Sequence, residues 1–313
     1  ELFQAIWREG RPVAVENLLG RLNLPWDPAH WQNQPIQDDI QIIDCCTGLI
    51  QPPPLPQMTP FAKMLRQTHQ VIPKIKDWPP NADFKDVFPD HFADFMQALP
   101  FPEYTLRDGQ LNLVSRLPGC FIPPELGPKM YIAYASSDQP GSKGTTNLHL
   151  DMADAINLMV YSPPVDDPTG PDAPPAAAVW DIFPFEDLPK IRNFLRNRAQ
   201  RLNISFDDPI HDQSIYLHTG LLAQLFEEEG VRPWRVLQNP GDAVFVPAGC
   251  AHQVCNYANC IKVAMDFVSP ENISRCYQLT TEFRLLKHRH LRKPDLLQLQ
   301  SILYHAWLDS EVV

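Results

Sequence analysis

Three residues of this sequence have the side-chain types and the spacing needed to bind one metal ion. His149 and Asp151 are separated by a single residue, and His252 follows far downstream, after the turn-like residues 247–249. Two imidazoles and one carboxylate cover one face of a metal and leave the other face open for an oxidisable co-substrate and O₂. This is the ligand set of non-haem iron(II) oxygenases, so we predict that the three residues bind Fe(II) and form the catalytic centre.

Strand geometry explains how these side chains could reach one ion. Residues i and i+2 of a strand point to the same side, which places His149 and Asp151 together while Leu148 and Leu150 face away. Around the second histidine, residues 240–242 predict a turn, 243–246 a buried strand and 247–249 another turn, and His252 begins the next strand. This order of elements, in which a strand and a turn precede a histidine that begins the next strand, is typical of a double-stranded β-helix. The alternative is that all three are ordinary polar residues on half-buried strands.

The wider pattern predicts a mainly β protein with surrounding helices (α+β), built on a double-stranded β-helix of the cupin-like jelly-roll type. We expect a single domain over 1–313, with a helical and loop-rich part at 1–129, a β-helix core at 130–268 and C-terminal helices at 269–313. A helical insert at 188–230 interrupts the core. The expected strands are 11–15, 131–134, 146–151, 155–161, 179–183 and 261–267, and the expected helices are 92–99, 188–202, 221–229, 271–288, 295–308 and one that begins near residue 61 after the proline-rich connector 51–56.

Composition limits the class of protein. Hydrophobic residues make up 44% and charged residues 20% of the 313, as in ordinary globular proteins. No apolar run approaches the ~18–20 residues of a membrane span, so no membrane association is expected. Seven cysteines, without the spacing of a zinc site, favour a reduced intracellular protein. The sequence begins at Glu1, which suggests an excised fragment. The net charge of −11 argues against direct DNA binding and mildly favours a cationic partner.

A second set of residues fits the co-substrate of such an oxygenase. Lys262 lies on the face of the last core strand that it shares with Ala264 and Asp266, whereas residues 261, 263, 265 and 267 make the other face apolar. We therefore predict that Lys262 binds the distal carboxylate of 2-oxoglutarate, although most lysines point into solvent. Thr146 and Asn157 are further candidates for hydrogen bonds to the oxo-acid, and Asn256 is a weaker one.

Several blocks of the sequence resemble a JmjC domain. They are residues 75–80, 102–105, 108–113, 127–131, 144–151, 208–214 and 263–271. Together these blocks are similar to the Jumonji-domain-1 (lysine demethylase 3) type of histone lysine demethylase, and the resemblance runs nearly from end to end. Carried over position by position, the family's iron ligands fall on His149, Asp151 and His252. Many JmjC proteins place the 2-oxoglutarate lysine on the strand near 176–178, where this chain has three alanines; that departure favours Lys262.

The resemblance implies an Fe(II)- and 2-oxoglutarate-dependent dioxygenase, nuclear in location, that demethylates mono- or dimethylated lysine 9 of histone H3. An N-methyl group is hydroxylated and lost as formaldehyde while 2-oxoglutarate becomes succinate and CO₂. Two other interpretations stay open: a JmjC hydroxylase with another substrate, and a non-catalytic chromatin scaffold. If the partner is a histone H3 tail, acidic residues should gather around the iron opening. The candidates are Asp154, Asp166, Asp167, Asp172, Asp207 and Asp208.

Overall fold

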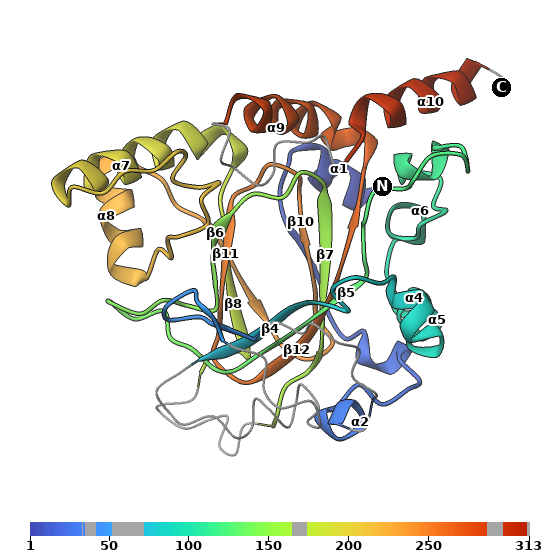
Figure 1. Cartoon of the computed structure of the whole chain (residues 1–313), viewed down its shortest axis with the longest axis horizontal. Helices are drawn as coiled ribbons and strands as arrows, with labels where there is room; N and C mark the ends of the chain where they lie inside the picture. The colour runs from blue at the N-terminus through green and yellow to red at the C-terminus, as the bar shows by residue number, and fades with distance from the viewer. Residues whose placement is uncertain (33, 35–41, 52–71, 165–173, 287–296, 312–313) are drawn as a thin grey trace.

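Alternating apolar and polar side chains produce two antiparallel sheets that face each other in this computed structural model (Figure 1). The structure describes residues 1–313 except 33, 35–41, 52–71, 165–173, 287–296 and 312–313. The larger sheet has the order β1-β10-β7-β12-β5-β4-β2-β3 and the smaller one β6-β11-β8-β9. The strands are β1 (Val13–Val15), β2 (Ile42–Asp44), β3 (Ile50–Gln51), β4 (Pro73–Trp78), β5 (Lys129–Ala133), β6 (Thr146–His149), β7 (Asp154–Tyr161), β8 (Ala178–Ile182), β9 (Trp234–Gln238), β10 (Ala243–Val246), β11 (His252–Asn256) and β12 (Cys260–Phe267).

The two faces of the larger sheet have different surroundings. On β12, Ile261 and Val263 join the main hydrophobic core on the outer face, whereas Lys262 lines a cavity between the sheets. On β10, Phe245 packs in that same outer core while Val244 and Val246 pack against residues of the smaller sheet. The strand period of two therefore separates an outer core, covered by N-terminal aromatic residues, from the interior of a double-stranded β-helix.

Helices cover the outer faces of both sheets (Figure 1). Helices α7 and α8 lie beside the smaller sheet, where Leu148 and Leu150 share a hydrophobic cluster with helical residues such as Phe194. Helix α8 ends at Gly230, whose backbone is left-handed (φ 69°), as the sequence predicted. The helices are α1 (Leu2–Arg8), α2 (Pro28–Gln32), α4 (Phe84–Val87), α5 (Pro89–Ala98), α6 (Pro102–Thr105), α7 (Leu188–Arg201), α8 (Thr219–Glu229), α9 (Ile273–Leu285) and α10 (Leu299–Glu311), with 3₁₀ turns η1 (Leu19–Arg21), η2 (Leu113–Arg116), η3 (Phe185–Asp187) and η4 (Pro270–Asn272).

The predicted fold class is confirmed, but the N-terminal part differs from expectation. Residues before 130 were expected to be helical and loop-like apart from the strand at 11–15, which is present as β1, yet they also contribute β2, β3 and β4 to the larger sheet. The edge strand β9 was not predicted either. Helix α10 begins at Leu299 rather than near 295, and Trp307 on this helix is 57% exposed. The connector at 51–56 and the helix near 61 fall almost entirely outside the described residues.

Among the described residues, no helix has both the length and the apolar character needed to cross a membrane.

Candidate metal and co-substrate site

The smaller sheet brings the three predicted metal ligands together. Strand β6 ends at His149, and Asp151 follows two residues later, still on the same side because Leu148 and Leu150 are buried in the cluster beneath α7 and α8. His252 is the first residue of β11 and pairs directly with His149 across the two antiparallel strands. One ligand atom from each of the three residues lies within 4.8 Å of the others.

The distances suit a shared cation. The Asp151 carboxylate lies 3.8 Å from Nε2 of His149 and 3.4 Å from Nε2 of His252, and the two imidazole centroids are 4.2 Å apart. Ligand atoms that bind one ion at about 2.0–2.2 Å lie about 3 Å apart when their bonds are at right angles. The present spacing is close to that value, so the residues fit one metal ion with little movement.

Backbone carbonyls fix the orientation of both imidazoles. Nδ1 of His149 donates to the carbonyl of Asn147 at 2.8 Å, and Nδ1 of His252 donates to the carbonyl of Cys250 at 3.0 Å. A carbonyl oxygen can only accept, so Nδ1 carries the proton in each ring. The lone pair of each neutral imidazole is then on Nε2, the nitrogen that faces Asp151. The sequence did not predict these carbonyl contacts.

A cavity of about 370 Å³ between the sheets joins the metal ligands to the predicted co-substrate residues. Thr146, Asn157, Asn256 and Lys262 all line it, together with His149, Asp151 and His252. These residues come from β6, β7, β11 and β12, so both sheets contribute to one site. The structure therefore brings together every residue that the sequence predicted for the site.

Lys262 is buried in this cavity, and its side-chain amine forms no hydrogen bond with any described residue. Its side chain is 5% exposed, and Nζ has no hydrogen-bond partner among the residues that the structure describes. Nζ lies 5.1 Å from the ring centroid of Trp180. The pKa of Lys262 is lowered to about 8, mainly by burial; Cys260 and Cys255 oppose the decrease, and Lys74 makes a smaller contribution to it. A buried amine that points into a cavity without an acceptor is suited to binding an anion.

The other predicted co-substrate residues are held by their neighbours. Gln238, which is fully buried, donates from Nε2 to the backbone carbonyl of Asn157 at 2.9 Å and to its side-chain oxygen at 3.4 Å. The amide nitrogen of Asn157 is thereby left to donate elsewhere. The side-chain oxygen of Asn256 has no hydrogen-bond partner among the described residues, while its backbone N–H donates to the Thr145 hydroxyl at 2.9 Å.

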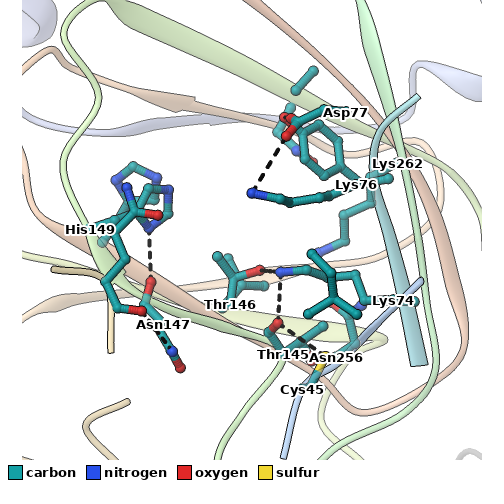
Figure 2. A pocket seen from close by; sticks show the side chains of 18 of the residues that line it. Cys45, Lys74, Lys76, Asp77, Thr145, Thr146, Asn147, His149, Asn256 and Lys262 are labelled. Atoms are coloured by element: carbon teal, nitrogen blue, oxygen red, sulfur yellow. Dashed lines mark hydrogen bonds and ion pairs between the residues drawn. The ribbon is translucent and has the colours of Figure 1, made fainter. Parts of the chain in front are cut away.

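Two residues of the site were missed by the sequence analysis. Trp180 on β8 stacks on His252, with ring centroids 5.9 Å apart, and also lies beside Lys262. Lys74 on β4 donates to the Thr146 hydroxyl and the Thr145 carbonyl (Figure 2). Trp180 and Ile182 are two residues apart on β8 and share one buried cluster, so strand alternation along 179–183 could have placed Trp180 inside. For Lys74, the available signal was the alternation Lys74-Ile75-Lys76, which is typical of a strand with an apolar face and a charged face.

The prediction that acidic residues gather around the iron opening needs correction. Asp154 is fully buried and accepts from the backbone N–H groups of Ala248 and Ser269, and burial raises its pKa to about 6. Asp208 is 7% exposed and pairs with Arg192 at 2.8 Å. These two side chains therefore support the fold. Asp207 is exposed, whereas Asp166, Asp167 and Asp172 lie outside the described residues.

Comparison with known proteins agrees with this arrangement. Residues 173–267 match the family described as "JmjC domain, hydroxylase". The chain is 44% identical to "Lysine-specific demethylase 3" of Drosophila melanogaster over 98% of its length, and 39% identical to "Lysine-specific demethylase 3A" of Mus musculus over 99%. The chain carries a JmjC domain of the lysine demethylase 3 type. It is also 33% identical over 97% of its length to "Lysine-specific demethylase JMJ26" of Arabidopsis thaliana.

This JmjC chain is shorter than its relatives. It spans 40% of the Drosophila protein, 26% of the mouse protein and 42% of the Arabidopsis protein. Its similarity to each nevertheless covers nearly all of its own residues, including the segments on both sides of the matched family region.

Proposed function

We propose that this JmjC chain is an Fe(II)- and 2-oxoglutarate-dependent dioxygenase that demethylates histone lysine, with mono- and dimethylated lysine 9 of histone H3 as the substrate. The observation that carries the proposal is one cavity lined by His149, Asp151 and His252, whose ligand atoms lie within 4.8 Å of one another, and by Lys262, whose amine has no hydrogen-bond partner in the described part of the chain. A metal and an anionic co-substrate fit that combination.

Each residue has a role in this proposal. Nε2 of His149, Nε2 of His252 and the carboxylate of Asp151 hold the metal, with the carbonyls of Asn147 and Cys250 keeping both imidazoles in the binding tautomer. Lys262 neutralises the C5 carboxylate of 2-oxoglutarate, and Thr146, Asn157 and Asn256 donate hydrogen bonds within the same cavity. When bound, iron(II) with 2-oxoglutarate and O₂ supplies the oxidation that converts an N-methyl group into an unstable hemiaminal.

The relatives support the lysine substrate, since the Drosophila, mouse and Arabidopsis proteins are all named lysine-specific demethylases. A histone H3 tail as partner and a nuclear location follow from that proposal, as does the absence of direct DNA binding by a chain with a net charge of −11. A protein hydroxylase is the second candidate, because the family description itself names a hydroxylase. A non-catalytic scaffold has no chemical use for all three metal ligands.

The test is mass spectrometry of H3 peptides that carry mono- or dimethylated lysine 9, incubated with Fe(II), 2-oxoglutarate and ascorbate. The demethylase predicts loss of methyl groups and release of formaldehyde, both abolished by Asp151→Ala and retained by the exposed control Asp86→Ala. A hydroxylase would consume 2-oxoglutarate and leave the methyl groups in place. A scaffold would bind the peptide and release no succinate.

A further inference from the structure

Lys74 connects the two sheets at the co-substrate end of the cavity. It lies on β4 of the larger sheet, where it pairs with Ala133 of β5, and its side chain reaches β6 of the smaller sheet. Nζ donates to the Thr146 hydroxyl at 3.0 Å and to the Thr145 carbonyl at 2.9 Å (Figure 2). Lys74, Thr146 and Lys262 all line the same cavity.

The contact with Lys74 constrains the direction in which the Thr146 hydroxyl donates. An ammonium group can only donate, so the Thr146 oxygen accepts from Lys74 and its own hydrogen must point elsewhere. A hydroxyl hydrogen normally rotates to suit its surroundings. Here one lone pair of the Thr146 oxygen already accepts a hydrogen bond from Lys74. The hydroxyl hydrogen is thereby directed away from Lys74 and is available to donate to a ligand, and Thr146 lines the cavity.

Lys74 also acts electrostatically on Lys262 across this cavity. The charge of Lys74 lowers the pKa of Lys262, and burial is the main cause of the lowered pKa of Lys74 itself. Cys45 and Asp77 raise the pKa of Lys74, while Lys76 lowers it. An anion placed between Lys74 and Lys262 would relieve their repulsion, which is a feature of a site that is completed by a negatively charged ligand.

We propose that Lys74 is a positioning residue for the co-substrate: it holds the Thr146 hydroxyl as a donor to the carboxylate that Lys262 binds. This inference rests on the proposed function. In this arrangement Lys74 acts through Thr146 and favours the binding of oxo-acids that have a second carboxylate. A lysine that merely joined the two sheets would affect all oxo-acids equally.

The experiment is calorimetric titration of the protein, loaded with Mn(II), with two ligands of equal chain length. 2-Oxoglutarate carries the distal carboxylate, and 2-oxopentanoate lacks it. In Lys74→Met, the Kd of 2-oxoglutarate is expected to rise about tenfold or more, because a hydrogen bond to a charged group is lost. The Kd of 2-oxopentanoate should stay within about twofold. The control Lys85→Met removes an exposed lysine on α4 and should change neither value.

A double-mutant cycle with Thr146→Val tests the route of the effect. If Lys74 acts through the hydroxyl, adding Lys74→Met to Thr146→Val should raise the Kd of 2-oxoglutarate by less than about twofold. A full tenfold loss in the Thr146→Val background would mean that Lys74 acts on the anion directly, and would overturn the positioning role. Equal losses for both ligands in Lys74→Met would also overturn it.

Two further outcomes keep the test decisive. If Lys74→Met does not fold, Lys74→Gln carries the same comparison, with the same loss of preference for 2-oxoglutarate expected. If the wild-type protein binds neither ligand better than the other, the proposed function fails and the inference fails with it. If the wild type prefers 2-oxoglutarate and the Lys74 variants keep that preference, only the inference fails.

Discussion

The buried amine of Lys262 destabilises the fold in the absence of a ligand. Its pKa is lowered from 10.5 to about 8, mainly by burial. The unfolded chain therefore binds more protons than the folded one between pH 8 and 10.5, and the free energy of unfolding rises with pH across that window. Below pH 8 the penalty is fully present, and a pKa lowered from 10.5 to about 8 corresponds to about 3–4 kcal/mol.

Replacing Lys262 by Met should consequently stabilise the ligand-free protein. At pH 7 we expect the free energy of unfolding to increase by about 3–4 kcal/mol, and the gain should shrink as the pH approaches 10.5. Urea unfolding of wild type and Lys262→Met at both pH values measures this difference. A variant less stable than wild type at pH 7 would contradict the interpretation of Lys262 as a residue kept for binding. The same variant should lose affinity for 2-oxoglutarate.

Asp151 is the metal ligand whose removal gives the cleanest test of the proposed donor set. Asp151→Ala removes the only charged ligand of the three while leaving both imidazoles hydrogen-bonded to backbone carbonyls. We expect the affinity for Mn(II) to fall about 100-fold or more, the scale of loss seen even when outer-shell partners of ligands are removed. Equilibrium dialysis against Mn(II) measures it, with Asp86→Ala as the exposed carboxylate control. An unchanged affinity would place the metal elsewhere.

At the residue scale, the sequence predicted the site where chemistry requires particular side chains at particular spacing. Strand alternation was enough to bring His149 and Asp151 together and to turn Lys262 inward. It did not reveal Lys74, because that lysine belongs to a strand whose cavity-facing residues are charged and look like a solvent face. It misplaced Asp154, whose burial depends on backbone N–H groups from two distant segments.

At the scale of elements, strand β6 is held in place by the packing of the turn before it. Gly144 has a left-handed backbone (φ 61°), and a Cβ there would lie 2.3 Å from the ring of Tyr216. Its carbonyl accepts from the Ser136 hydroxyl at 2.7 Å. A side chain at this position would therefore strain the backbone and displace a buried tyrosine, close to Thr146 and His149.

Gly144→Ala should reduce both stability and metal affinity. The left-handed backbone alone costs a non-glycine residue about 1–2 kcal/mol, and the collision with Tyr216 adds to it. Gly230→Ala is the matched control, because Gly230 has a similar φ of 69° and open space around its Cβ position. Thermal unfolding should show a larger decrease in Tm for Gly144→Ala than for Gly230→Ala. Equal decreases would show that Tyr216 adjusts freely.

The elements that the sequence missed share a physical cause. In β4 the alternating pattern places Lys74 and Lys76 beside a cavity, whereas charged strand residues usually face water. Strand β9 lies at the edge of the smaller sheet with alternate residues exposed, so its apolar signal is weak. The core strands β7, β10 and β12 were predicted because their burial leaves long apolar patterns.

At the scale of the whole molecule, the charge of −11 should assist the capture of a cationic peptide. Asp77, Asp151 and Asp266 line the cavity that contains the metal ligands, and the exposed Glu125 lines an adjoining one. We expect kcat/KM on an H3 tail peptide to fall clearly as ionic strength rises to physiological values, since exposed charges are then screened over ~8–10 Å. A kcat/KM that does not change with ionic strength would contradict electrostatic steering of the peptide, but not the proposed demethylation.

The overall architecture was predictable because two sheets that each bury one face leave few ways to close a core. The sequence did not predict how far the N-terminal segment contributes to the sheet, since β4 joins the larger sheet through long-range pairing with β5, and β2 in turn pairs with β4. The pairing of β4 with β5 also places Lys74 beside the cavity.

The central claim is that one cavity holds the metal and 2-oxoglutarate side by side. A crystal structure of the complex with Mn(II) and 2-oxoglutarate tests it most directly. We expect one manganese ion bound by His149, Asp151 and His252, with the C5 carboxylate of the co-substrate at Nζ of Lys262. Manganese bound at other residues, or an oxo-acid whose distal carboxylate points away from Lys262, would contradict it.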